Sequence, residues 1–491
     1  MSLQPQDVPE IPNDTFEVAK AVFPPGNLYL QMREQLGIIY KDHDFVELFS
    51  HRGQPAESPW RLVLVCIKQF IDNLSDRQAA AVRARIDWKY VLSLPLNDTG
   101  FNFSVLSEFR NRLLSTGKEQ ELLNLFLTHL KEKGLLKTYH RQRTDATHVL
   151  ASVRALNRLE LLSETVRAAL NSLSAVHPDW LAEHREEGWF ERYGRRIENY
   201  RLLKLDSKRE ALANTIGCDG LTLMAGIYTT DSPMWLREIP AVETLRQVWV
   251  QQFYPPNSDG LGQWRITKDM PSSGNSIHSP YDIDARYSNK RSMDWVGYKA
   301  HLTEICDDSS PRIITHVHTT HGTVPDGQVV QQIHQELEQK NLLPQEHFMD
   351  GGYLSAEHLV NSKAQHQINI IGPIREDHSW QAKAGEGFDI NSFQIDWKRQ
   401  CAICPQGHIS TKWQPDQDIH GKAIIKVRFL GKTCRTCPVR SQCTQSKSQP
   451  RELTFRPQAL FVALNERRKV QNTEEFQQKY GTRAGIESAH S

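Results

Sequence analysis

The first third of the chain has the apolar spacing of amphipathic helices. Apolar side chains return every three, four or seven positions, so one stripe of each segment can face a core. The spacing predicts a helical domain of four to six helices over residues 21–138, and it is clearest at Val63, Cys66, Ile67, Phe70 and Ile71. Residues 1–20 are rich in Pro, Asp and Asn, a composition that predicts a flexible arm.

Beyond residue 139 the pattern becomes that of a mixed sheet. Strand patterns cover 148–153, directly after Asp145, and then 294–304, 312–320 and 368–374. Helical spacing resumes at 154–215, which predicts a helical insert over about 155–275, and an amphipathic helix is expected over 326–343. Phe348 and Met349 end a short strand just before Asp350. The element order predicts an α/β domain over 139–491 and fits neither a hydrolase elbow nor a P-loop.

Composition narrows the class of protein. A chain of 491 residues with 39% apolar and 24% charged residues is long enough for several structural units with real cores. The net charge is +1, so nucleic-acid binding would depend on local basic patches. The start of the chain has no signal-peptide pattern, and the most apolar stretch, 61–71, is short and interrupted by Lys68. We therefore expect a cytoplasmic protein, associated with the nucleoid.

Three carboxylates stand in settings that suggest chemistry. Asp145 and Asp350 lie at strand positions, where a short side chain is held rigidly, and Glu487 lies in a helical segment, where a longer one can reach. Two-metal phosphoryl transfer needs hard oxygen ligands that converge from several elements. We interpret the three as catalytic ligands of Mg²⁺ or Mn²⁺. Asp326, by contrast, is expected to cap the helix that follows it.

The C-terminal segment has the most specific pattern. Tyr480, Arg483 and Glu487 have the spacing i, i+3 and i+7, which puts them on one face of an α-helix. Such a face is poorly suited to a core and well suited to phosphate and metal. The alternative is an ordinary exposed Arg–Glu pair.

Five cysteines lie between positions 401 and 443. Cys401 with Cys404 and Cys434 with Cys437 form two CxxC pairs, an arrangement typical of tetrahedral zinc. Cys443 or His408 could replace one of these four ligands. An iron–sulfur cluster and free thiols stay open as alternatives. This locally basic segment predicts a Cys-rich insert over about 376–450.

Two further groups of polar residues have more than one interpretation. Arg110 and Arg112 lie on a predicted helix and form either a solvated face or a contact to DNA phosphate. His316 and His318 share a strand face, but no carboxylate is near them in sequence, so we interpret them as strand-end polar residues.

Together these motifs resemble those of bacterial insertion-sequence DDE transposases that have an InsH-type helical N-terminal domain. The resemblance rests on Thr144–Thr147, Asp350–Tyr353 and the Tyr480, Arg483, Glu487 signature, with support from 279–286 and 295–299. It implies an RNase H-like catalytic core in which Asp145, Asp350 and Glu487 bind Mg²⁺ or Mn²⁺. Tyr480, Arg483 and Lys299 would contact DNA.

The resemblance also implies an activity and partners. The expected function is metal-dependent strand cleavage and strand transfer at terminal inverted repeats, with double-stranded element and target DNA as partners and a homodimer as the assembly. The family signature continues with a basic residue at what would be position 494, so we expect a truncated copy. The alternatives are an inactive DNA-binding protein and a metal-dependent nuclease.

Overall fold

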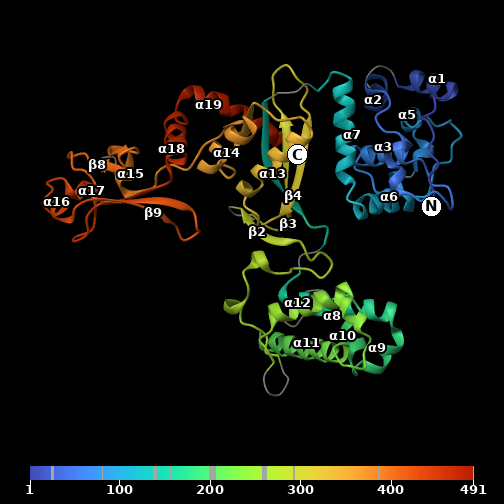
Figure 1. The fold of residues 1–491 in the computed structure, drawn as a ribbon. Coiled ribbons are helices and arrows are strands. Elements are labelled where there is room, and N and C mark those ends of the chain that lie inside the picture. The colour runs from blue at the N-terminus through green and yellow to red at the C-terminus, as the bar shows by residue number, and fades with distance from the viewer. Residues whose placement is uncertain are drawn as a thin grey trace.

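The computed structural model describes residues 1–23, 27–79, 81–136, 141–153, 156–197, 206–256, 262–290, 293–384 and 387–489. A helical domain, a central sheet, a helical insert and a C-terminal lobe follow one another along the chain (Figure 1). The boundary predicted between 138 and 139 lies outside the described residues. In the described part, no helix is both long and apolar enough to cross a membrane.

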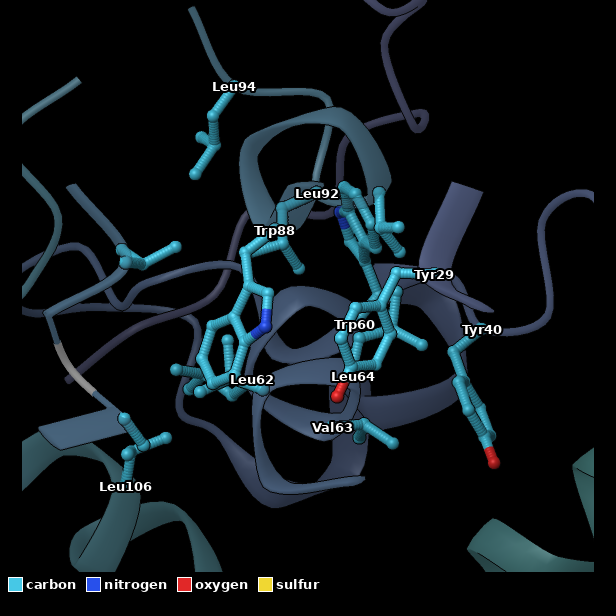
Figure 2. Close-up of a cluster of buried hydrophobic side chains, with 14 of the residues drawn as sticks. Tyr29, Tyr40, Trp60, Leu62, Val63, Leu64, Trp88, Leu92, Leu94 and Leu106 are labelled. Carbon is cyan, nitrogen blue, oxygen red and sulfur yellow. The ribbon is translucent and has the colours of Figure 1, made fainter. Parts of the chain in front are cut away.

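The N-terminal domain consists of short helices around one aromatic core. Figure 2 shows Trp60, Trp88 and Tyr29 packed together, and the ammonium of the buried Lys68 lies 5.3 Å from the rings of Tyr29 and Trp88. Burial lowers the pKa of Lys68 well below its ordinary value. The elements are α1 (Asn13–Val22), α2 (Leu28–Leu36), η1 (Asp42–Leu48), α3 (Pro59–Ile71), α4 (Asp76–Ala79), η2 (Ala81–Ala84), α5 (Ile86–Val91), α6 (Ser104–Ser115) and α7 (Glu119–Glu132).

The predicted flexible arm differs from the structure. Residues 13–22 form α1, in which Ala19 is fully buried and the Thr15 hydroxyl donates a hydrogen bond to the carbonyl of Leu94. Ser2 is also buried and bridges to Ser50 and Pro55. The prediction relied on composition, whereas a few buried contacts are enough to order the segment.

A mixed six-stranded sheet forms the centre of the molecule. β1 pairs antiparallel with β3 and parallel with β5, while β6 extends the β5 side, and β2 and β4 both pair with β3. This mixed α/β architecture is consistent with an RNase H-like core. The strands are β1 (Arg141–Leu150), β2 (Arg286–Lys290), β3 (Met293–Ile305), β4 (Ile314–His321), β5 (Glu346–Met349) and β6 (Asn369–Ile371).

Alternating side chains of the sheet face two different layers. One face packs against α7, η7 (Asp326–Val329) and α13 (Val330–Gln339), in a core that includes Met349 and Ile370. On the other face, Phe348 and Ile371 pack against Phe476 of α19 (Glu474–Gly481). The period of two along each strand explains this division. β6 is shorter than the predicted 368–374 strand.

The helical insert has a core of its own. It comprises α8 (Arg158–Val176), α9 (Pro178–His184), α10 (Trp189–Tyr193), α11 (Asp206–Ile227), η4 (Met234–Glu238) and α12 (Pro240–Gln252), followed by η5 (Thr267–Asp269) and η6 (Ser273–Asn275). Asn157 starts α8 with a capping box to Glu160. Figure 1 shows the insert in green, below the sheet. Its two ends flank Gly297 of β3, because Leu150 of β1 and Arg286 of β2 both pair with that residue.

The C-terminal part begins with α14 (Ala356–His366), which follows Asp350, and continues into a small lobe. The lobe has a two-stranded and a three-stranded sheet around Val427, Phe429 and Phe455. Its elements are α15 (Trp380–Ala384), η8 (Ile390–Ser392), β7 (Gln394–Asp396), β8 (Cys401–Ile403), β9 (Lys412–Gln417), β10 (Ala423–Arg428), α16 (Gly431–Arg435), α17 (Arg440–Cys443) and β11 (Glu452–Phe455). α18 (Gln458–Val470), α19 and η9 (Thr482–Ala489) return the chain to the sheet.

Candidate active site

Two of the three predicted carboxylates lie on neighbouring parallel strands. Thr144 of β1 pairs with Met349 of β5, so Asp145 and Asp350 each come one residue after paired positions. Asp145 is 8% exposed. One Asp350 oxygen accepts a hydrogen bond from the Gly352 amide at 2.8 Å, which orients the carboxylate at the turn after β5. The register of β1 and β5 and the turn after β5 thus place the two carboxylates at neighbouring positions.

Arg483 contacts both carboxylates. Its Nη2 atom lies 2.6 Å from Asp145 Oδ2 and 4.0 Å from Asp350 Oδ2, although the chain separates Arg483 from each of them by more than a hundred residues. Burial acts to lower the pKa of Arg483, but the charge of Asp145 and its hydrogen bond, together with the charges of Tyr480 and Asp350, outweigh burial and raise the pKa overall. The guanidinium therefore provides the positive charge between two acidic groups that would otherwise repel each other.

Glu487 is exposed, whereas Arg483, which contacts this pair of aspartates, is half-buried. The segment after Gly481 is the 3₁₀ helix η9, which has about three residues per turn. Arg483 and Ile486 then share a face, which packs on the sheet and buries Ile486 completely, while Glu487 is exposed. The face that the spacing predicts for an α-helix is therefore not formed. The role of Glu487 as a metal ligand stays a prediction.

Asp326 supplies a carboxylate that the sequence analysis assigned to helix capping. It lies in the first turn of η7, and its Oδ1 atom is 2.9 Å from the ammonium of Lys299. A Cβ placed on Gly352 would lie 3.0 Å from Asp350 Oδ1 and 3.2 Å from Asp326 Oδ2, so these two carboxylates line the same small space. No local signal in the sequence indicated this role, because the approach of Asp326 to Asp350 is a tertiary contact.

Tyr353 is buried, and the charges of all three aspartates act on its hydroxyl group. Its hydroxyl is 2.7 Å from Nδ1 of His301, and its pKa is raised, first by burial and then by the charges of Asp326, Asp145 and Asp350. These carboxylates and their hard oxygen atoms suit Mg²⁺ or Mn²⁺. The donor types therefore match those of a divalent cation, although among the described residues the three carboxylates do not bring three oxygen atoms within 4.8 Å of one another.

A groove runs beside the carboxylates. The cavity has a volume of about 180 Å³ and lies over β1, β2 and β3. The rings of His148 and Trp295 lie 5.1 Å apart on its wall, and Lys290 and Lys299 add positive charge. Its lining residues are Ala146, Thr147, His148, Ser288, Asn289, Lys290, Trp295, Lys299 and Asp326.

Comparison with protein families gives two matches, one near each end of the chain. Residues 17–112 match a transposase domain (DUF772), and residues 403–491 match a transposase DDE domain. Both matches support an insertion-sequence DDE transposase. The second match contains Tyr480, Arg483 and Glu487, whereas Asp145 and Asp350 lie outside both. Neither a curated protein nor a solved structure matches the chain significantly.

The predicted DNA-contacting residues have partners within the fold. Arg110 pairs with Asp76 at 2.6 Å, and Arg112 donates a hydrogen bond to the Leu48 carbonyl. Lys299 contacts Asp326, as described above. Tyr480 is half-buried against Phe476, and burial raises its pKa. Their contact with DNA stays a prediction.

The five clustered cysteines do not lie in one place. A single cavity is lined by Cys404, Cys434, Cys437 and Cys443, and His408 lies on its exposed rim. Cys401 belongs to β8, pairs with Asp396 and does not line this cavity.

His316 and His318 have a carboxylate near them in the fold, although none is near them in the sequence. Among the described residues, only His316, His318 and Glu336 bring three potential ligand atoms of His, Cys, Asp or Glu within 4.8 Å of one another. Glu336 comes from α13, which packs on β4. Burial lowers the pKa of His316 to about 3, so the imidazole is neutral. The sequence could not show this grouping, because Glu336 lies on α13 and meets the two histidines of β4 only when the helix packs on that strand.

Proposed function

We propose that the protein is a DNA transposase that cuts and joins DNA strands at the terminal inverted repeats of its own element. The observation that carries this proposal is the approach of Asp145 and Asp350 to one Arg483 nitrogen, within a chain that matches transposase families at both ends. Asp145, Asp350 and Glu487 would hold Mg²⁺ or Mn²⁺, and Asp326 lies close enough to assist.

The metal, when bound, would activate the attacking oxygen and stabilise the leaving oxygen of the phosphodiester. The residues of the chain position these partners. Arg483 carries a guanidinium suited to bidentate contact with phosphate. Lys290 and Lys299 offer positive charge along the groove, and Trp295 offers a ring for stacking an unpaired base. Two element ends must be joined in one reaction, so a homodimer is the proposed assembly.

The test uses duplexes taken from the DNA that flanks the coding sequence. Purified protein should nick and join these duplexes only when Mg²⁺ or Mn²⁺ is present. Asp145→Asn or Asp350→Asn should lower the cleavage rate by about 10³-fold or more, because several kcal/mol of charge stabilisation disappear. Asp231→Asn, at an exposed position of the helical insert, is the matched control and should cleave normally.

Other outcomes would contradict the proposal in distinguishable ways. Cleavage without joining would favour a nuclease, and binding without cleavage would favour a DNA-binding protein that lacks activity. Cleavage that survives Asp145→Asn would show that the catalytic centre lies elsewhere.

A further inference from the structure

The cavity in the C-terminal lobe brings together thiols from three places in the chain. Cys404 follows β8 in a tight turn, where its amide bonds the His408 carbonyl and its carbonyl accepts from the Gly407 amide. Cys434 lies in α16, Cys437 lies just after it, and Cys443 ends α17. The cavity has a volume of about 40 Å³, enough for one water-sized occupant.

Cys401 packs differently from these four thiols. Cys404, Cys434 and Cys443 pack against the hydrophobic core of the lobe. Cys404, Cys434, Cys437 and Cys443 all line the same small cavity. Cys401 is held on β8 by its pairing with Asp396, and its neighbour Ala402 is the residue that enters the core.

We propose that Cys404, Cys434, Cys437 and Cys443 bind one structural zinc ion, and that Cys401 is not a ligand. Four thiolates, from the turn after β8, from α16 and the residues just after it, and from α17, would form the closed tetrahedral set that zinc prefers in structural sites. Among the described residues, no three of these sulfur atoms lie within 4.8 Å of one another. Binding therefore requires the side chains to rotate inward between staggered rotamers.

Two features of the lobe favour a metal at this position. The buried hydrophobic residues of the lobe are few, and small units with few buried residues commonly need a metal or a disulfide for stability. The guanidinium of Arg451 also lines the cavity and interacts with Cys443. A zinc ion with four thiolates has a net negative charge, which this arginine would offset.

The test compares three half-buried cysteines in the full chain, one expected not to bind zinc and two expected to bind it. Zinc content measured by mass spectrometry should be about one ion per chain in the unmodified protein and in Cys401→Ser, and should fall about tenfold or more in Cys443→Ser and Cys434→Ser. Titration of the metal-free protein with Co²⁺ alone provides a second measurement. The absorption of a tetrahedral thiolate site should develop in the unmodified protein and in Cys401→Ser, but not in Cys443→Ser.

Three results would overturn the proposal: loss of zinc in Cys401→Ser to the same extent as in Cys443→Ser, full zinc content in Cys443→Ser, or no zinc and no cobalt spectrum in the unmodified protein. None of these measurements involves DNA cleavage. Failure of the zinc site is therefore distinguishable from failure of the proposed transposase activity.

Discussion

At the scale of single residues, Arg483 is the side chain on which the geometry of the candidate site depends most. It lies 2.6 Å from Asp145, which is almost fully buried, and near Asp350. The position suggests that a divalent cation and the guanidinium compete for the same carboxylate oxygens. This competition can be measured without any DNA.

Replacing Arg483 by alanine should weaken the metal-free protein and strengthen ion binding. The melting temperature without divalent ions should fall, since a buried carboxylate loses its partner at a cost of about 1–3 kcal/mol. The apparent Kd for Mn²⁺ should become about tenfold lower, which corresponds to about 1.4 kcal/mol. Calorimetric titration and thermal melting with and without Mn²⁺ check this expectation.

Arg467→Ala is the matched control, because Arg467 donates its hydrogen bonds to the carbonyls of Ile370 and Gly372 and contacts no carboxylate of the site. It should lower the melting temperature without changing Mn²⁺ affinity. Weaker Mn²⁺ binding in Arg483→Ala would contradict the competition.

The sequence predicted individual residues where local pattern determines their position. Asp145 lies within β1 and Asp350 directly after β5, close to the strand positions predicted for them. The contact between Asp145 and Arg483 spans 338 residues and depends on the return of η9 to the sheet. Asp326 pairs with Lys299 of another element, and only the folded structure shows that it lies near Asp350.

At the scale of elements, η9 fits closely against β1. Arg143 of β1 is buried, pairs with Glu304 at 2.6 Å and donates a hydrogen bond to the Thr482 carbonyl. A Cβ on Gly485 would lie 2.1 Å from Nη1 of Arg143. Since two hydrogen bonds and an ion pair restrain this guanidinium, it cannot simply move away.

Gly485→Ala should therefore destabilise the protein by about 1–3 kcal/mol, the usual cost of inserting an atom into a packed contact. Gly481→Ala offers a control only four residues away, because nothing lies within 4 Å of a Cβ at that position. Alanine at the end of α19 should be neutral or stabilising by up to about 1 kcal/mol. Urea denaturation measures both free energies of unfolding, and equal effects would show that η9 does not pack as described.

The helix η9 also shows a case in which prediction from periodicity fails. The spacing of Tyr480, Arg483 and Glu487 predicts one face only if the α-helix continues, whereas the chain changes to a 3₁₀ helix after Gly481. Propensity did not signal that change, since the docking of Ile486 on the sheet is a tertiary effect. The strands over 293–305, 314–321 and 346–349, by contrast, were predictable to within a few residues.

At the scale of the whole molecule, the core contains neutral histidines that connect its layers. His334 of α13 is 3.0 Å from His347 of β5, and His347 is 2.6 Å from the Thr144 hydroxyl. Burial lowers the pKa of His334 to about 3, with further lowering from His366 and His358. Burial also lowers the pKa of His347 well below its ordinary value, and His334 and His316 act in the same direction.

These histidines predict acid sensitivity of the entire fold. Unfolded histidines take up protons below about pH 6.5, whereas folded His334 stays neutral until about pH 3 and the pKa of folded His347 lies well below its ordinary value. The unfolded chain thus binds more protons, and stability falls as the pH decreases from about 6.5, by about 1 kcal/mol per histidine and pH unit.

Thermal melting between pH 7.5 and 5 measures this slope. His334→Gln should reduce it, and His420→Gln, at an exposed position, should leave it unchanged. A melting temperature that is constant over this range would contradict the assignment of neutral buried histidines.

The position of the helical insert affects how such a chain can evolve. Both of its ends flank Gly297, where an added Cβ would lie 2.1 Å from the Val149 carbonyl, so the two ends are two strand spacings apart, about 10 Å. Any module whose own termini are that close could be exchanged for the insert without shifting the register of β1, β2 or β3. The central sheet and the insert can therefore have separate ancestries, and this junction is a natural place to graft another domain.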